Sequence, residues 1–273
     1  MSTATSTATK MPTLYIPHGA GPCFFMDWTM GPKDTWNKLA GWLRGIDASL
    51  PESPRALVVI SAHWEAPVPT VLASERPPLL FDYYGFPKHT YELEWAAPGS
   101  PELAKRIGSL LSAAKIESQS DSQRGFDHGV FVPLKVAYPD AKIPTVQLSL
   151  RADLDPKAHL AIGRALEPLR DEGVLIVGSG MSFHNMGAFR SGGGGPAATA
   201  FDGWLSSAVA KDPEARIASL AAWAQAPSAR ESHPREEHLL PLMVAAGAAG
   251  SDAGRAVFRD VAMGVTISAI RFG

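Results

Sequence analysis

The amino-acid sequence predicts an α/β fold, a single-domain αβα sandwich with a mostly parallel central sheet. Three observations support this prediction. Continuous apolar runs at residues 56–60 and 174–177 are typical of strands that are covered on both faces. Segments with the spacing of amphipathic helices alternate with such runs. The 273 residues, of which 45% are hydrophobic, suit one large domain with a substantial core.

In the first half of the chain, a short strand is expected at 14–16. Apolar residues recur on one side of 33–47, which predicts a helix there. The apolar run at 56–60 is a buried strand, and a second strand is expected at 68–73. A proline stands at the first position of 101–114, where a helix tolerates it best, so this segment is also predicted to be helical.

The second half continues the alternation of strands and helices. The apolar run VLIV provides its strongest strand signal, and a proline again suits the start of the last helix. The expected elements are a strand at 143–150, a helix at 156–170, a strand at 174–177, one or two helices at 197–224, an apolar helix at 234–249 and a closing strand or hairpin at 257–270.

Composition and charge exclude several kinds of partner. The net charge is −2 and there is no basic run, so neither nucleic acid nor a membrane is expected to bind. No stretch of 18 apolar residues predicts a transmembrane helix, and the N-terminus lacks the apolar centre of a signal peptide. Residues 1–12 are expected to form a mobile tail before a catalytic domain at 13–273. A single cysteine, Cys23, fits the cytoplasm, which is the expected location.

Histidines gather where predicted strands end, which is where parallel sheets bind their ligands. His18 and His63 follow the first two buried runs, and His184 follows the run at 174–177 through a glycine turn. His238 lies on the last predicted helix, and His128 stands between glycines that permit a tight backbone. One such histidine is usually a hydrogen-bonded structural ring, but several together favour a metal site, because neutral imidazole is the commonest metal ligand. The pattern alone leaves ligand, base and packed ring open.

Other candidate features give weaker evidence of a functional site. His89 and His159 have no comparable context and are expected at the surface. Cys23 has no adjacent base and is interpreted as a small buried thiol. The glycine-rich segment 191–196 follows no strand directly and lacks the lysine of a phosphate-binding loop.

Five segments together resemble a known family. The segments are YIPHGAGP (15–22), VVISAHWEAP (58–67), GFDHGVFVPL (125–134), GSGMSFHNM (178–186) and HPREEHLLPLMVAAGAAG (233–250). They resemble, in this order, the DODA-type extradiol aromatic ring-opening dioxygenases. This is the type III, LigB-like class, which shares its fold with the catalytic subunit of protocatechuate 4,5-dioxygenase. The resemblance extends from about residue 13 to residue 270.

The resemblance implies an αβα sandwich with one non-haem metal, natively Fe(II), in a site that Zn(II) can also occupy. It implies that His18, His63 and His238 are the metal ligands. It makes His184 the base beside the metal, or a fourth ligand when zinc is bound, and it places His128 next to oxygen and substrate. The implied activity is extradiol cleavage of a catechol-type ring with O₂ to a muconic-semialdehyde-type product.

The sequence departs from the family at two places. In the protocatechuate branch the third ligand is a glutamate, whereas the last helix here offers Glu236, Glu237 and His238. The His-Pro-x-x-x-His pattern at 233–238 favours His238 as the ligand. In a helix Glu237 would point about 100° away from His238, so the two are not expected to bind the same ion. The two glutamates are then expected in a solvated first turn, where negative charge suits the helix N-terminus. The second departure is Ala20, which stands where the first loop usually has a serine.

The surroundings of these residues leave two questions. Phe24, Phe25 and Trp28 follow the first ligand and either form a pocket wall or belong to the core. Asp127 precedes His128 and either orients an imidazole or points elsewhere.

In the implied reaction, His184 takes a phenolic proton of the catechol and His128 stabilises or protonates an oxygen-derived anion. Two alternatives remain at this stage, namely a zinc-dependent hydrolase and a non-enzymatic binding member of the same fold. The identity of the catechol stays open. A homodimer is expected only because two-fold assemblies are common.

Overall fold

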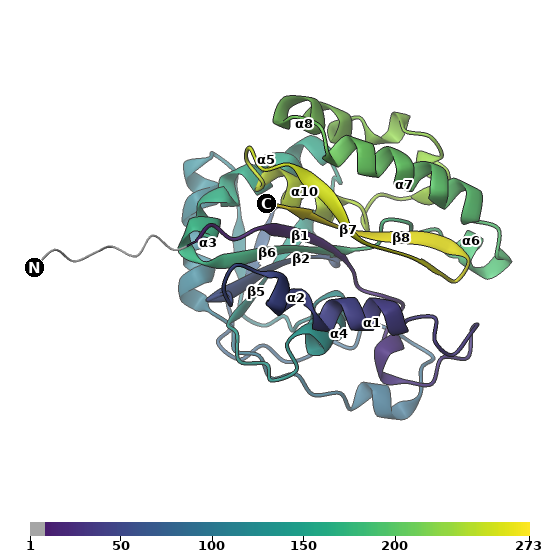
Figure 1. Cartoon of the computed structure of the whole chain (residues 1–273). Coiled ribbons are helices and arrows are strands. Elements are labelled where there is room, and N and C mark those ends of the chain that lie inside the picture. Colours follow the sequence, from purple (N-terminus) through teal and green to yellow (C-terminus); the bar gives the residue numbers. More distant parts are fainter. Residues whose placement is uncertain (1–8) are drawn as a thin grey trace, which may run out of the picture.

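The computed structural model describes residues 9–273, and within them the chain forms one eight-stranded sheet with helices on both faces (Figure 1). The strands are β1 (Thr13–Pro17), β2 (Ala56–Ala66), β3 (Thr70–Leu72), β4 (Gln119–Asp121), β5 (Thr145–Arg151), β6 (Val174–Gly180), β7 (Gly254–Ala262) and β8 (Val265–Phe272). The α-helices are α1 (Asn37–Arg44), α2 (Ile46–Ser49), α3 (Pro101–Ala113), α4 (His128–Ala137), α5 (Pro156–Leu166), α6 (Met186–Ser191), α7 (Gly195–Val209), α8 (Pro213–Ala221), α9 (Ala229–Ser232) and α10 (Leu240–Gly247).

The strand order is β4-β3-β5-β2-β6-β1-β8-β7. The centre of the sheet is parallel, because β2 pairs in parallel with β5 and β6, and β6 pairs in parallel with β1. Towards the edges, β3 pairs antiparallel with β5, and the β7–β8 hairpin adds antiparallel strands next to β1. The expected α/β domain with a central, mostly parallel sheet is confirmed.

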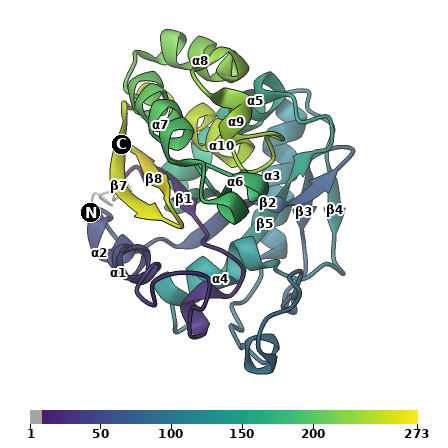
Figure 2. The ribbon, with the colours of Figure 1, turned by 90° about the vertical axis from the view of Figure 1, so that its right-hand side faces the viewer.

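The two faces of the sheet bury two hydrophobic clusters. Along β2, Val58 and Ile60 pack in the cluster beneath α3, α5 and α10, while Leu57 and Val59 pack in the cluster beneath α1 and α4. The views in Figures 1 and 2 show these helices on opposite sides of the strands. A strand that is buried on both faces needs no polar alternation, which explains the continuous apolar run at 56–60.

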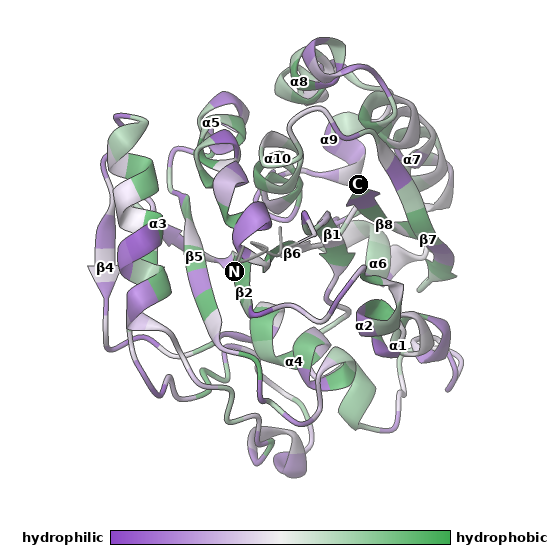
Figure 3. Ribbon diagram, turned by 60° about the vertical axis from the view of Figure 1, so that its left-hand side comes forward, coloured by the Kyte–Doolittle hydropathy of each residue, from purple (hydrophilic) through white to green (hydrophobic). Residues whose placement is uncertain are grey.

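Several elements differ from the prediction, among them β4, α6 and α9, which were not expected. The strand expected at 56–60 continues to Ala66. The expected helix at 234–249 begins only at Leu240, and the residues before it form turns. Helix α4 was not predicted, because it is apolar on nearly all sides and contains Pro133, so its sequence lacks a helical period. Figure 3 shows α4 as hydrophobic along most of its length, as its burial requires.

The start of the described chain is packed against the domain. Most of the tail expected at 1–12 lies outside the described residues. Met11 and Pro12 are buried, and the Met11 amide donates a hydrogen bond of 3.0 Å to the Arg170 carbonyl. Arg170 Nε donates back to the Met11 carbonyl at 2.6 Å. Among the described residues, no helix is long and apolar enough to cross a membrane.

Candidate metal centre

Three neighbouring parallel strands bring histidines to one edge of the sheet. His18 directly follows β1, and its amide donates a hydrogen bond of 3.1 Å to the carbonyl of Gly180 at the end of β6. His63 lies in the last part of β2, and His184 follows β6 by four residues. The carboxyl edge of a parallel sheet thus gathers side chains that are far apart in the sequence.

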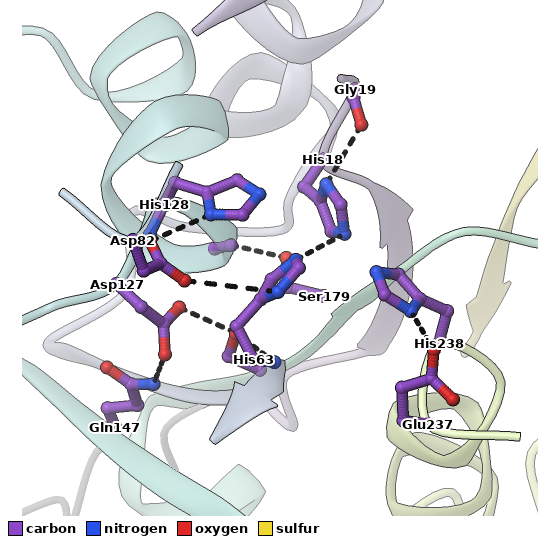
Figure 4. A network of polar contacts seen from close by, with 12 residues as sticks. His18, Gly19, His63, Asp82, Asp127, His128, Gln147, Ser179, Glu237 and His238 are labelled. Carbon is purple, nitrogen blue, oxygen red and sulfur yellow. Dashed lines mark hydrogen bonds and ion pairs between the residues drawn. The ribbon is translucent and has the colours of Figure 1, made fainter. Parts of the chain in front are cut away.

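His18, His63 and His238 form a compact group (Figure 4). One ring nitrogen from each lies within 4.8 Å of the others, and the Nε2 atoms of His18 and His63 are 3.2 Å apart. The ring centroids are separated by 4.8 to 5.2 Å. Three imidazole nitrogens that converge in this way can share one metal ion.

The opposite ring nitrogens have partners that leave the converging nitrogens free. His18 Nδ1 lies 3.0 Å from the Gly19 carbonyl oxygen, so it is assigned as the donor. His238 Nδ1 lies 2.9 Å from Glu237 Oε1, which likewise places the proton on Nδ1. His238 Nε2 is buried and has no hydrogen-bond partner among the described residues. A buried lone pair without a partner fits a metal ligand, and such an outer carboxylate or carbonyl is the usual support of a metal-bound histidine.

The electrostatics of the group keep it in the ligand form. Burial lowers the pKa of His18, of His63 and of His238 well below the usual value, and the neighbouring imidazoles lower these pKa values further. The three rings are therefore neutral at pH 7, and only neutral imidazole binds a metal.

The backbone of His238 is held from β1 and β6, although it lies outside any helix. Its carbonyl oxygen accepts hydrogen bonds from the Tyr15 hydroxyl at 2.6 Å and from the Met181 amide at 3.1 Å. A Cβ at Gly180 would lie well inside van der Waals distance of this oxygen. Glycine at position 180 thus allows the approach that brings His238 to the other two histidines.

A buried polar network holds the backbone of His63. The register between β2 and β5 shifts between Ile60 and Glu65, and His63 lies within this irregular stretch. Its amide donates to Ser61 Oγ at 3.2 Å, and Ser61 in turn donates to Asp127 Oδ1 at 2.7 Å. Arg124 Nη2 joins the His63 carbonyl to Asp127 Oδ2, with both contacts at 3.2 Å.

Asp127 contacts no imidazole in this network. Gln147 Nε2 donates to its second oxygen, and burial followed by the nearby charge of Asp82 raises the pKa of its carboxyl. The idea that Asp127 orients an imidazole is therefore not supported. It orients the main chain on either side of His63 instead.

His128 begins α4 and faces the group from the side of His63. Its Nδ1 lies 2.8 Å from Asp82 Oδ1, and its amide donates to the same oxygen at 2.9 Å. The ring centroids of His128 and His63 are 3.9 Å apart. Burial opposes ionisation of Asp82, but the hydrogen bonds from His128 outweigh it and lower the pKa of this carboxyl. Sequence reasoning missed Asp82, because it lies in an irregular segment without a motif.

His184 stacks on His238, with ring centroids 3.4 Å apart and an interplanar angle of 13°. Glu237 Oε1 lies 2.9 Å from His238 Nδ1 and 3.4 Å from His184 Nδ1, so one carboxylate serves both rings. Burial opposes ionisation of Glu237, but the hydrogen bond from His184 helps to lower the pKa of this carboxyl. Among the described residues, the potential ligand atoms of His184, Glu237 and His238 lie within 4.8 Å of one another. His184 is not part of the group that His18 and His63 form with His238.

The expectation that Glu236 and Glu237 are both solvated was wrong. The side chain of Glu237 is only 13% exposed, and it faces the histidines. Glu236 pairs with Arg230 at 2.5 Å, and no contact of its side chain with a histidine is found among the described residues. The error came from the assumed helix, because residues 234–239 form bends and turns, to which the helical spacing of about 100° per residue does not apply.

Two of the remaining histidines were also expected at the surface. His89 is exposed, as expected. His159 is fully buried, and its Nε2 accepts a hydrogen bond of 3.1 Å from the Arg151 amide. That part of the expectation was wrong, because helix α5 turns its His159 face towards β5.

A pocket of about 730 Å³ opens over the histidines. Its floor includes His18, His63, His128, His184 and His238. Aromatic side chains form much of its wall, namely Trp28, Trp36, Tyr83, Tyr84, Phe86 and Phe189. Of the three aromatic residues whose place was open, Trp28 lines the pocket, whereas Phe24 and Phe25 pack against the core beside it. An aromatic ring of substrate size fits such a cavity.

Comparison with known proteins finds a matching family. Residues 12–270 match the family described as the catalytic LigB subunit of aromatic ring-opening dioxygenase. A relative from Beta vulgaris, named 4,5-DOPA dioxygenase extradiol, is 40% identical over 88% of this chain and 87% of its own. A relative of the same name from Escherichia coli K12 is 35% identical over 88% and 86%.

A solved structure is similar to this chain in fold and in sequence. The crystal structure of an uncharacterized protein from Escherichia coli K12 superimposes with a TM-score of 0.76 at 31% sequence identity. The match covers 96% of this chain and 100% of that chain.

Proposed function

This chain belongs to the LigB family of aromatic ring-opening dioxygenases and is a ring-cleaving dioxygenase, and from this premise we propose that it is an Fe(II)-dependent extradiol enzyme. Its substrate is a catechol-type ring, which it opens next to the diol with both atoms of O₂. The product is of the muconic-semialdehyde type. The observation that carries the proposal is the group of three neutral imidazoles on the floor of an aromatic-walled pocket.

In this proposal, His18, His63 and His238 hold the metal. The bound ion supplies the Lewis acidity and the redox chemistry that catecholate and O₂ need. Three neutral ligands leave the charge of a dication uncompensated, so the site favours an anionic catecholate over a neutral catechol. Zinc fits the same nitrogen donors and binds them more tightly than Fe(II) in the usual order, so purified protein can carry zinc.

His184 acts as the base in this scheme. Its Nδ1 faces Glu237, which places the proton on that nitrogen and leaves the lone pair on Nε2. The ring lines the pocket, where Nε2 can accept a phenolic proton. The carboxylate of Glu237 then stabilises the resulting imidazolium. With zinc in the site, His184 would instead be a fourth ligand.

His128 serves the oxygen side of the reaction. Asp82 holds its Nδ1 proton at 2.8 Å, so the ring keeps one orientation in the pocket. In this scheme the Nε2 of His128 delivers a proton to an oxygen anion. His128 thus pairs with Asp82 and His184 with Glu237, on two sides of the group of ligand histidines.

Relatives support the substrate class, since several are named 4,5-DOPA dioxygenase extradiol and DOPA is a catechol. We also propose a cytoplasmic location, which the single buried Cys23 supports, and a homodimer, which rests on the frequency of two-fold assemblies.

The test is anaerobic reconstitution of metal-free protein with Fe(II) or Zn(II), followed by oxygen uptake with a panel of catechols. We expect oxygen uptake in equal molar amount to catechol loss, together with a yellow ring-opened product, in the iron form alone. Hydrolysis of ester substrates by the zinc form without oxygen uptake by the iron form would favour a hydrolase. Catechol binding without turnover in either form would favour a binding protein.

A further inference from the structure

The charge of the pocket wall is concentrated in one side chain. Among the described residues that line the pocket, Arg190 alone carries a permanent charge, and no aspartate, glutamate or lysine joins it. The rest of the wall is aromatic, methionine, glycine or alanine, apart from the imidazoles on the floor. A guanidinium in such surroundings attracts an anion, which it can bind through two parallel hydrogen bonds.

Arg190 lies at the outer end of the pocket. It also lines a neighbouring groove of about 690 Å³, and it shares this boundary position with Met30, Phe189 and Met263. The five histidines line the pocket but not the groove. A ring whose two oxygens face the histidine floor would therefore extend a substituent towards Arg190.

The helix that carries Arg190 is anchored next to the floor. Helix α6 begins two residues after His184 and lies at the sheet edge where β1 and β6 end (Figure 2). Asn185 caps it by accepting from the Ala188 amide at 3.0 Å, and Asn185 also donates to the Glu231 carbonyl at 2.7 Å. From Met186 to Arg190 the helix rises about 6 Å. The backbone of Arg190 is thus tied to the same anchored segment that carries the base.

Arg190 is available to a ligand. Its guanidinium takes part in no ion pair among the described residues, whereas Lys38 in the neighbouring groove is paired with Asp260 at 2.9 Å. The pocket mouth also exposes large apolar side chains, since Met30 is 54%, Met186 50% and Tyr84 87% exposed. An apolar linker that ends in an anion would match this rim.

We propose that Arg190 determines specificity by binding a carboxylate on the ring substituent of the substrate. The proposal rests on the proposed catechol dioxygenase function and adds to it the residue that recognises the ring substituent. Arg190 contacts the substituent and takes no part in the proton transfers.

The experiment compares a catechol that carries a propanoate side chain with its primary amide. The two ligands differ in charge and hardly in shape. Dissociation constants are measured without oxygen from the quenching of fluorescence, for which Trp28 and Trp36 in the pocket wall are the reporters. KM and kcat are then measured in air with the iron form. The variants are Arg190→Gln, Arg190→Lys and the control Lys38→Gln, which removes a cation that lines only the groove.

We expect the native protein to bind the acid about 10- to 100-fold more tightly than the amide, as a charge-assisted contact typically provides. Arg190→Gln should remove this preference by raising the dissociation constant and the KM of the acid towards those of the amide. Arg190→Lys should keep part of the preference, and Lys38→Gln should keep all of it.

Equal binding of acid and amide by the native protein would overturn the role of Arg190. So would a preference that Arg190→Gln leaves intact, or one that Lys38→Gln abolishes equally, since that points to the general field of the groove. Failure of the proposed function looks different, because neither ligand would then support oxygen uptake, while the two dissociation constants would still decide the role of Arg190.

Discussion

At the scale of single residues, the hydrogen bond that Nδ1 makes in an imidazole determines whether Nε2 has a free lone pair. His18 and His238 hold their protons on Nδ1 through a carbonyl and a carboxylate, which leaves Nε2 for a metal. His128 and His184 face the carboxylates of Asp82 and Glu237 and can exchange protons. His238 and His184 share the Glu237 carboxylate, so it is the position of the ring relative to His18 and His63, and not the hydrogen-bond partner alone, that distinguishes them.

The first prediction concerns a proposed ligand. Loss of an outer hydrogen-bond partner typically lowers metal affinity about 10- to 100-fold. His238→Ala should lower iron affinity by more than this, because it removes a direct ligand. His89→Ala is the matched control, since His89 is exposed and lies outside the pocket lining. Metal content after dialysis against a weak chelator measures the effect. Unchanged iron content in His238→Ala would contradict the proposed ligand set.

The second prediction separates two adjacent glutamates. Glu237→Gln removes the charge that supports His238 and His184, so iron affinity should fall about 10- to 100-fold and turnover should fall with it. Glu236→Gln should change neither, because Glu236 pairs with Arg230 instead. Titration of metal-free protein with Fe(II) compares the two variants. Equal effects would mean that total charge matters rather than the contact with the rings.

At the scale of elements, the carboxyl end of β6 helps to position the site because two of its residues have no side chain. Both Gly178 and Gly180 lie where a Cβ would collide with a carbonyl oxygen, that of Pro241 and that of His238 respectively. The segment from His238 to the first turn of α10 can therefore cross close over β6. The glycine pattern of this strand allows His238 to reach the histidines from β1 and β2.

The third prediction tests this close crossing. Gly180→Ala should destabilise the fold by about 1–3 kcal/mol, as overpacking of a core typically does, and it should also lower metal affinity by displacing His238. Gly203→Ala is the control, because Gly203 lies in α7 with open space around its Cα. That change should be neutral, or should stabilise the helix by up to about 1 kcal/mol. Urea unfolding together with iron titration measures both properties; a native-like Gly180→Ala protein would refute the steric argument.

At the scale of the whole molecule, buried histidines outside the site link folding to pH. His159 is fully buried, and its Nε2 accepts from the Arg151 amide, so it cannot carry a proton there without breaking this bond. His233 is also fully buried, and Nε2 lies 3.0 Å from the Ser182 carbonyl oxygen. Burial lowers the pKa of His159, and it lowers the pKa of His233 to about 3.

The fourth prediction follows from the sign of these shifts. A histidine is half-protonated at about pH 6.5 in the unfolded chain, whereas the folded state keeps His233 neutral down to about pH 3. Above about pH 6.5 neither state binds the proton, so these histidines do not make the free energy of unfolding depend on pH. Below it, only the unfolded state binds the proton, and stability falls by up to about 1.4 kcal/mol per pH unit for each such histidine.

The measurement is urea unfolding of metal-free protein at several pH values between about 5 and 7.5. His233→Gln, whose amide can still donate to Ser182, should flatten the slope relative to the native protein. The exposed His89→Gln should leave the slope unchanged. Identical slopes in all three proteins would show that His233 is not kept neutral by folding.

Much of the architecture follows from local sequence patterns. The continuous apolar runs at 56–60 and 174–177 determine strands that are buried on both faces, because such runs cannot be stable at a solvated face. Strands that alternate with helices determine a parallel centre, and in such a sheet the histidines after the first strands meet at one edge. His18 and His63 could therefore be expected together from the sequence alone.

Other features depend on contacts between distant segments, and only the tertiary structure decided them. Asp82 reaches His128 from an irregular loop, and Glu237 turns inward because its segment is a turn that crosses β6 instead of a helix. Arg190 meets the pocket only because α6 folds back over the same sheet edge. A sequence pattern reports periodicity along the chain, whereas the direction of a side chain in a loop is determined by the segments that pack against it.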